Sequence, residues 1–343
     1  MHPFEWQRAH SAAEAVAAGA TTVAAAMLAP NGARPAADAI VVKAGGIDLL
    51  DLMKEGLVEP RRLVDLHGVA GLDRVAEGED GTLRIGAMVT LAQVGAHPLV
   101  AERYAALADA TRESASLQIR NVATLGGNLL QRPRCWYFRS AAHHCTRKGG
   151  IDCFAFGGEN QYHAIFDHQH CAIVHPSTAA TALVALGAKV ALAGADGADR
   201  EILLEDFLLL PAQDVHREND LRAGEILTEI VLPRAARPLR SVHVKQGEKD
   251  SFDWPLADVA VVLGLKPDGT CESASIVLGA AAPVPHRAKA AEAALIGAKV
   301  DEAAARRAAQ AALAGAVPLS KNAYKLPLFE TLVRRAILAV AAA

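Results

Sequence analysis

Four of the five cysteines lie in one short stretch of this 343-residue chain. Cys135, Cys145, Cys153 and Cys171 are separated by nine, seven and seventeen residues, and Cys271 stands far from them. Thiolates are ligands that iron–sulfur clusters and structural zinc prefer, and a [4Fe–4S] cube takes one at each iron. An odd number of cysteines in a chain of this length does not indicate a disulfide framework. The stretch therefore predicts a metal or cluster site.

The spacing favours a cluster over zinc. Structural zinc sites usually contain close cysteine pairs, and none occurs here, although four thiolates, or three with His143 or His144, would satisfy tetrahedral zinc. Nearby glycines would let the loop wrap a cube, while Arg147 and Lys148 would offset its negative charge. The aromatic run Trp136–Phe138 would shield it from water. Four free buried cysteines are the simplest alternative, and the polar, glycine-rich surroundings argue against it.

Two glycine pairs, Gly45-Gly46 and Gly126-Gly127, are candidates for binding phosphate. Paired glycines reach positive φ, where successive backbone N–H groups turn inward and form an anion-binding nest. We expect Thr124 and Asn128 to add side-chain donors, and Asp48 to cap a helix beside the first pair. One such pair is an ordinary tight turn. Two pairs with polar neighbours favour the two phosphates and ribityl chain of FAD, because the common dinucleotide and Walker motifs are missing.

Alternating short strands and helices must position these residues, which predicts an α+β fold. Strands are expected at Ile40–Val42, Leu83–Ile85, Ile173–Val174, Lys189–Leu192, Ile202–Leu204 and Ile226–Val231. Helices are expected at Ala12–Ala18 (capped by Ser11), Leu99–Ala110 and Ser177–Ala185.

A linker with two prolines at Leu232–Pro238 precedes a second pattern. Strands are expected there at Val242–Lys245, Val259–Leu265 and Ser273–Leu278, with a hairpin turn at Lys266–Thr270 between the last two. Helices should follow at Arg287–Ile296, Asp301–Ala314 and Leu328–Ala342.

Composition excludes several classes of function. The net charge is −3, which indicates neither nucleic acid nor an anionic membrane surface as partner. No apolar run is long enough for membrane insertion, and Glu14 interrupts the alanine-rich start, so no signal peptide is predicted. The chain is expected in the cytoplasm, or in the periplasm if a partner's signal exports it.

Several blocks resemble the FAD subunits of the xanthine dehydrogenase and carbon monoxide dehydrogenase group of molybdenum hydroxylases. They are Ala44–Leu49, Gln118–Leu129, His175-Pro176-Ser177 and Val277–Ala288. The cysteine stretch resembles the subfamily that contains the FAD subunits of periplasmic aldehyde oxidoreductase and 4-hydroxybenzoyl-CoA reductase, which carry an extra [4Fe–4S] cluster.

The resemblance implies a PCMH-type FAD-binding domain at 1–236, with subdomains of about 1–58 and 59–236 and an iron–sulfur insertion at about 132–172. A smaller α/β domain with a three-stranded antiparallel sheet would follow at 237–343. It also implies that FAD is held by Lys43, Ala44, Gly45, Gly46, Ile47, Asp48, Leu49, Thr124, Gly126, Gly127, Asn128, Thr178 and Lys245. Ile47 stands where the family commonly has Thr, and Thr178 where it often has Asp, so each position changes a polar contact.

The implied function is electron transfer within a heterotrimer. Substrate would be oxidised at a molybdenum cofactor on a large subunit, and [2Fe–2S] clusters on a small subunit would pass electrons to FAD, which delivers them to an external acceptor. No catalytic residue is assigned to this chain. Two alternatives are a self-contained FAD-dependent oxidase, which needs a base over the flavin, and a zinc-stabilised module without redox chemistry.

Overall fold

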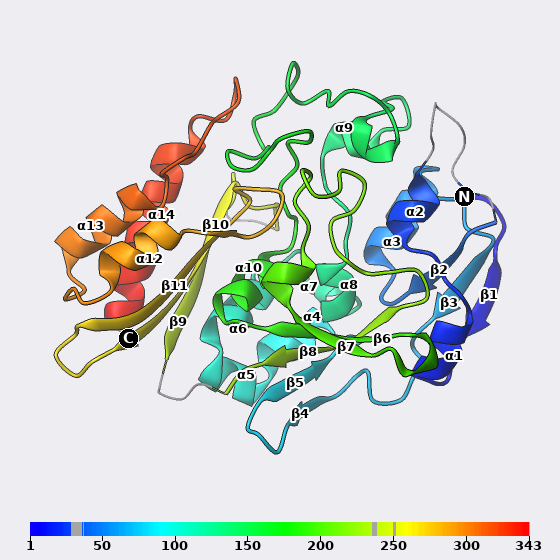
Figure 1. Ribbon diagram of the computed structural model, residues 1–343, viewed down its shortest axis with the longest axis horizontal. Helices are drawn as coiled ribbons and strands as arrows, with labels where there is room; N and C mark the ends of the chain where they lie inside the picture. Colours follow the sequence, from blue (N-terminus) through cyan, green and yellow to red (C-terminus); the bar gives the residue numbers. More distant parts are fainter. Residues whose placement is uncertain (29–35, 37, 235–238, 250–251, 343) are drawn as a thin grey trace.

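The structure is a computed structural model that describes residues 1–28, 36, 38–234, 239–249 and 252–342. Figure 1 shows an N-terminal part, a central part and a C-terminal sheet backed by helices on the opposite side of the molecule from the N-terminus. The predicted α+β class is confirmed. No helix in the described ranges is long and apolar enough to cross a membrane.

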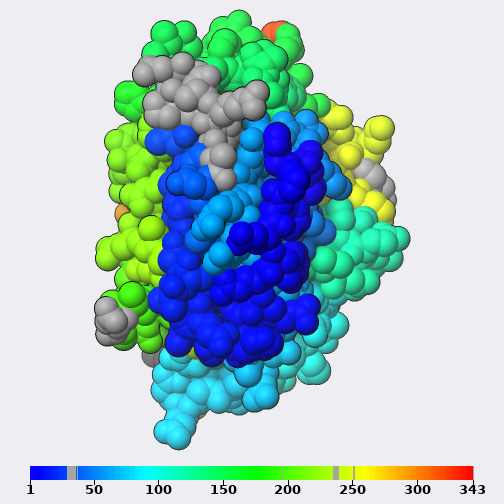
Figure 2. All heavy atoms as spheres, turned by 90° about the vertical axis from the view of Figure 1, so that its right-hand side faces the viewer, coloured from blue at the N-terminus to red at the C-terminus, as the bar shows by residue number. Residues whose placement is uncertain are grey.

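The N-terminal part holds a parallel sheet of three strands in the order β1-β3-β2. Its strands are β1 (Glu5–Arg8), β2 (Ile40–Lys43) and β3 (Arg62–Asp65), and its helices are α1 (Ala12–Ala17), α2 (Val23–Met27) and α3 (Ile47–Lys54). Ser11 caps α1 as predicted, accepting a hydrogen bond from Glu14 N. β2 and α3 flank the first glycine pair, which lies in the turn between them. Seen from its own side, this part covers much of one face of the molecule (Figure 2).

The central part is built on an antiparallel sheet of five strands in the order β4-β5-β8-β6-β7. The strands are β4 (Val75–Glu77), β5 (Leu83–Gly86), β6 (Lys189–Ala193), β7 (Arg200–Leu203) and β8 (Ile226–Leu232). The helices are α4 (Leu91–Ala96), α5 (Pro98–Arg103), α6 (Ala105–Arg112), α7 (Leu117–Arg120), α8 (Leu125–Leu129), α10 (Thr178–Ala185) and α11 (Leu204–Phe207). The insertion with the cysteines carries little regular structure beyond α9 (Trp136–Arg139) and a 3-10 turn, η2 (Thr146–Lys148).

Three predictions in this part were wrong in detail. The helix at Leu99–Ala110 is broken at Tyr104, which has a non-helical backbone (φ −136°, ψ 51°) and whose hydroxyl donates to the Pro233 carbonyl at 2.9 Å. Ile173–Val174 is not a strand but an irregular segment that runs between two cavities. Leu204 starts a helix instead of ending β7.

The C-terminal sheet has four antiparallel strands, one more than predicted. The strands are β9 (Arg240–Gln246), β10 (Ala257–Leu265), β11 (Cys271–Gly279) and β12 (His286–Arg287), and the helices are α12 (Lys289–Leu295), α13 (Glu302–Ala311) and α14 (Lys325–Ala342). β12 is only two residues long, too short to leave a pattern. α14 starts one turn before the predicted Leu328, because Pro327 fits a first helical turn. Within the predicted linker, Leu232 ends β8, and residues 235–238 lie outside the described residues.

Strand β10 fixes the C-terminal domain against the central part because both of its faces are buried. Val259, Val261 and Leu263 pack with the C-terminal helices, whereas Ala260 and Val262 join the core of the central part. This packing carries the neighbouring strand β9, and with it Lys245, to the region of the glycine loops.

Candidate cofactor-binding sites

Both glycine pairs line one cavity of about 480 Å³ where the three parts of the fold meet. Twelve of the residues predicted to hold a cofactor line it: Ala44, Gly45, Gly46, Ile47, Asp48, Leu49, Thr124, Gly126, Gly127, Asn128, Thr178 and Lys245. Lys43 lies beside the cavity instead, where its Nζ donates to the Ala44 carbonyl at 2.9 Å and to Asp65 at 3.2 Å. It therefore anchors the first glycine loop to β3.

The first glycine loop is shaped by close approach as well as by positive φ. Gly46 has a φ of +82° and is itself the N-cap of α3, so the prediction that Asp48 caps this helix was wrong. A Cβ on Gly45 would lie 2.2 Å from the Val122 carbonyl oxygen. The two glycine loops thus touch through their backbones at Gly45.

The second glycine pair differs from the predicted nest. Gly126 and Gly127 have no positive φ, because they lie within α8, which Thr124 caps by accepting a hydrogen bond from Gly127 N at 3.1 Å. Glycine is needed at 126 for packing, since a Cβ there would lie 2.7 Å from that of Ala87. Asn128 accepts a hydrogen bond from Ser177 at 2.5 Å, which ties α8 to the start of α10.

The opposite wall comes from α10 and from the C-terminal domain. The Thr178 hydroxyl lies 2.7 Å from that of Ser114 and donates to the Ala110 carbonyl. Lys245 reaches from β9 and donates to the Glu113 carbonyl at 2.9 Å. Burial lowers the pKa of Lys245, against the attraction of Glu113. The cation predicted to act from the C-terminal domain therefore does line the cavity.

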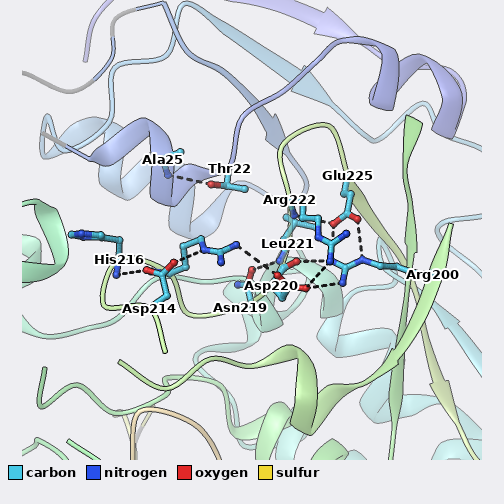
Figure 3. Close-up of polar contacts among 11 residues, drawn as sticks. Thr22, Ala25, Arg200, Asp214, His216, Asn219, Asp220, Leu221, Arg222 and Glu225 are labelled. Carbon is cyan, nitrogen blue, oxygen red and sulfur yellow. Dashed lines mark hydrogen bonds and ion pairs between the residues drawn. The ribbon is translucent and has the colours of Figure 1, made fainter. Parts of the chain in front are cut away.

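A polar segment at 214–225 forms another edge, and sequence reasoning had named none of it. Arg200 pairs with Asp220 at 2.7 Å and with Glu225 at 2.8 Å (Figure 3). Asp214 closes the turn at the start of this segment, where its carboxylate accepts a hydrogen bond from the His216 backbone N–H. These residues follow no helical or strand-like pattern in the sequence, so the sequence did not predict their contacts.

Asp48 joins the first glycine loop to the cysteine insertion. Its Oδ1 pairs with Arg134 at 2.8 Å and with Arg139 at 2.5 Å, and its Oδ2 accepts a hydrogen bond from Arg132 N at 2.8 Å. The residue predicted as a helix cap thus organises three arginines.

A buried ion network continues from this point to the cysteines. Glu218 lies 3.0 Å from the Arg132 guanidinium and 2.6 Å from that of Arg147, and all three are less than 5% exposed. The Arg147 Nε also donates to the Cys171 sulfur at 3.5 Å. This Arg132–Glu218–Arg147 network connects the wall of the large cavity with one of the predicted ligands.

The four predicted cysteine ligands line one small cavity of about 10 Å³. The Cys153 thiol hydrogen-bonds to Cys171, and this bond, aided by Arg147, lowers the pKa of Cys171. Burial raises the pKa of Cys135 to about 12. The fold therefore gathers Cys135, Cys145, Cys153 and Cys171 at one place, although 35 residues lie between the first and the last.

Aromatic rings and a histidine surround the sulfurs. Phe138 is fully buried, and Trp136 makes edge contacts with Tyr162 and His163, each at 5.6 Å between ring centres. His163 Nε2 lies 3.2 Å from the Cys135 sulfur. His163 is thus an imidazole in contact with a cysteine, whereas the zinc alternative had considered His143 or His144.

No three His, Cys, Asp or Glu side chains in the described part of the chain are arranged to hold a single metal ion. The space among the sulfurs suits about one water molecule, so a cluster would require the insertion to open around it. Cys271 is remote: it is buried in β11 and donates to the Ser273 carbonyl at 3.3 Å. The thiols thus fit a cluster in type and location, in a loop with little regular structure.

Comparison with known proteins matches the whole chain. Residues 2–235 match the family described as FAD binding domain in molybdopterin dehydrogenase, and residues 242–340 match the CO dehydrogenase flavoprotein C-terminal domain. The chain is 37% identical to the aldehyde oxidoreductase FAD-binding subunit PaoB of Escherichia coli, over 83% of this chain and 86% of that protein. It is 27% identical to the carbon monoxide dehydrogenase medium chain of Hydrogenophaga pseudoflava, over 86% of each chain. A solved carbon monoxide dehydrogenase structure from that organism superposes with a TM-score of 0.71 at 27% identity, covering 100% of this chain and 99% of the other.

Proposed function

The chain belongs to the FAD-binding oxidoreductase subunits of the xanthine dehydrogenase and carbon monoxide dehydrogenase family, and on that premise we propose that it is the electron-transfer subunit of a molybdenum hydroxylase acting on aldehydes. Its partners would be a large subunit with the molybdenum cofactor and a small subunit with [2Fe–2S] clusters. The observation that carries this proposal is the cavity where both glycine loops, Thr178 and Lys245 meet.

The residues around this cavity suit FAD. The close approach at Gly45 and the left-handed Gly46 keep side chains away from the first loop, where a pyrophosphate would bind. Thr124 and Asn128 fix the second loop, and Lys245 places a cation at the far wall. When bound, FAD would supply the redox chemistry, and this chain would position it and exclude water.

The cysteine insertion is proposed to hold a [4Fe–4S] cluster through Cys135, Cys145, Cys153 and Cys171. Supporting features are the shared cavity of the four sulfurs, the Arg147 guanidinium beside Cys171 and the aromatic shield. Outer hydrogen bonds and charges of this kind orient ligands and tune a metal centre.

We further propose that the FAD-binding domain ends near residue 236.

The oxidase alternative requires a free base in the cavity. Three of the carboxylates that line it, Asp48, Glu218 and Glu225, are each paired with arginine. Charge-assisted hydrogen bonds of this kind occupy the carboxylate oxygens and fix their direction toward the arginine. This pairing favours a relay of electrons over substrate chemistry on this chain.

The proposed function predicts that substrate turnover needs the complex. The isolated, FAD-loaded chain should reduce an artificial acceptor when its flavin is reduced chemically, but should not oxidise aldehydes. The native complex should oxidise them and should contain two further chains. The measurement is aldehyde-dependent dye reduction by both preparations, with their visible spectra. Aldehyde oxidation by the single chain would refute the proposal, and stoichiometric zinc without flavin would favour the non-redox module.

Gly45→Ala should reduce FAD content because the new methyl group would collide with the Val122 carbonyl oxygen at 2.2 Å. Backbone must shift to relieve this contact, which separates the two glycine loops, and overpacking typically costs about 1–3 kcal/mol. Gly157→Ala is a matched control, because no atom would lie within 4 Å of the added methyl group and the φ of Gly157 is not positive. The measurement is FAD per chain after gel filtration. Equal flavin in both variants would mean that contact between the loops is not needed for binding.

A further inference from the structure

A second cavity of about 260 Å³ lies between the cysteine insertion and the C-terminal domain. Its wall is shared with the large cavity at Arg134, Pro176, Asp253, Trp254 and Pro255. On another side it reaches Cys135. A molecule bound there would therefore lie between the proposed flavin site and a proposed cluster ligand, where electrons could reach it from reduced FAD.

Flat aromatic groups line this cavity. Trp136, Tyr162 and Trp254 contribute rings to its wall, and the Arg134 guanidinium stacks over Trp254 at 4.8 Å from the ring centre. Aromatic walls of this kind bind planar rings through stacked and edge contacts. The volume is sufficient for one small aromatic molecule but is smaller than the pockets typical of drug-sized ligands.

His175 carries a buried hydrogen-bond donor on this wall, and no described residue accepts from it. His175 is 4% exposed, and its Nδ1 accepts the N–H of Ser177 at 3.3 Å. Burial lowers the pKa of His175 to about 4, so the ring is neutral and its single hydrogen must be on Nε2. Nε2 has no hydrogen-bond partner among the described residues. Nε2 is shielded from solvent in this conformation, so a ligand carbonyl oxygen would satisfy this donor only after the ring turns toward the cavity.

Charge on the wall disfavours anionic ligands. Glu248 and Asp253 both line the cavity, and Tyr162 donates a hydrogen bond to Glu248. Among the described residues, Arg134 is the one arginine on this wall, and it already pairs with Asp48. Phosphate groups such as those of a pyridine dinucleotide would meet like charge here, whereas an uncharged ring would not.

We propose that this second cavity binds the external electron acceptor as a planar, uncharged quinone, and that the His175 ring turns toward the cavity so that its Nε2 donates a hydrogen bond to one carbonyl oxygen. The proposal rests on the proposed function, which supplies the reductant. When bound and fully reduced, FAD would supply two electrons and two protons. The quinone takes up the same two electrons and two protons, and leaves as the hydroquinone.

The test uses the full chain loaded with FAD, reduced anaerobically and mixed with acceptors in a stopped-flow instrument. Menadione is the neutral quinone, a sulfonated naphthoquinone is its anionic counterpart, and ferricyanide is an acceptor that needs no aromatic cavity. Val174→Phe and Leu256→Phe fill the cavity from positions that do not line the larger one. Val75→Phe, half-buried on the edge strand β4, is the matched control.

We expect menadione to re-oxidise the flavin at a rate that saturates with concentration, and the sulfonated quinone to be slower. Relative to the ferricyanide rate of the same protein, the menadione rate should fall at least tenfold in both cavity-filling variants. It should fall about fivefold in His175→Phe, which keeps a ring but removes the donor, and should be unchanged in Val75→Phe.

If the ratio of the menadione rate to the ferricyanide rate is unchanged in all cavity variants, the quinone site is overturned and the proposed function is left intact. Loss of FAD from Val174→Phe and Leu256→Phe would also overturn it, because the cavity would then hold part of the flavin. A wild-type chain that binds no FAD, or whose reduced flavin ferricyanide does not re-oxidise, would refute the proposed function and with it the acceptor site.

Discussion

Replacing Cys171 with serine should lower the iron and sulfide content of the chain about tenfold or more, since even lost outer-shell contacts cost 10–100-fold in metal affinity. Serine is a harder and poorer ligand for iron than a thiolate. Cys171 is also the sulfur that the Arg147 guanidinium contacts, so its loss leaves a buried cation without that partner. Serine at Cys135, Cys145 or Cys153 should have a similar effect, because all four sulfurs line the same cavity.

Cys271→Ser is the matched control for this series. Cys271 is a buried cysteine in β11, outside the cysteine cavity, so this variant should keep both cofactors. Iron, zinc, sulfide and FAD per chain should be measured anaerobically on all five variants. FAD should fall less than iron, because the glycine loops lie outside the insertion. Equal iron loss from Cys271→Ser would show that the ligands were wrongly assigned, and stoichiometric zinc in the wild type would refute the cluster.

The sequence was sufficient where a local pattern determines the structure. The apolar run of β10 is continuous because both faces of that strand are buried, and the turn at Lys266–Thr270 closes through the Lys266 N–H to Thr270 carbonyl bond at 2.9 Å. The sequence also assigned both glycine pairs to one cofactor, and both pairs line one cavity in the structure. By contrast, the edge strand β1 has the mostly exposed, polar sequence Glu-Trp-Gln-Arg, which gives no alternation to detect.

Long-range contacts explain what the sequence did not reveal. The second glycine pair was interpreted as a nest because glycine permits positive φ, whereas Gly126 is required by the proximity of Ala87. Glu218 had no signal at all, since its partner Arg147 lies 71 residues away in the chain. Ion pairs between distant segments depend on the completed fold, so neither spacing nor composition predicts them.

Glu218→Gln should destabilise the chain by about 3–5 kcal/mol, the usual cost of removing one partner from a buried ion pair. The substitution keeps the shape of the side chain but leaves Arg132 and Arg147 as two buried cations without the carboxylate between them. For a chain of this size, such a loss corresponds to a fall in Tm of roughly 4–7 °C. Glu201→Gln is the control, because its pairs with Lys189 and Arg84 are partly exposed and worth about 0–1 kcal/mol.

The same variant should affect both proposed cofactors, because Glu218 lines the FAD cavity and its partner Arg147 contacts Cys171. In the wild type, two arginines are balanced by Glu218 and, when it is a thiolate, by Cys171. Removing the carboxylate leaves excess positive charge near the sulfurs, which favours the reduced, more negative state of a cluster and should raise its reduction potential. Thermal unfolding with and without cofactors, FAD content and a redox titration of the cluster measure the three effects. A Tm and a cluster potential as little changed as those of Glu201→Gln would show that the Arg132–Glu218–Arg147 network links the two sites in space without coupling them in energy.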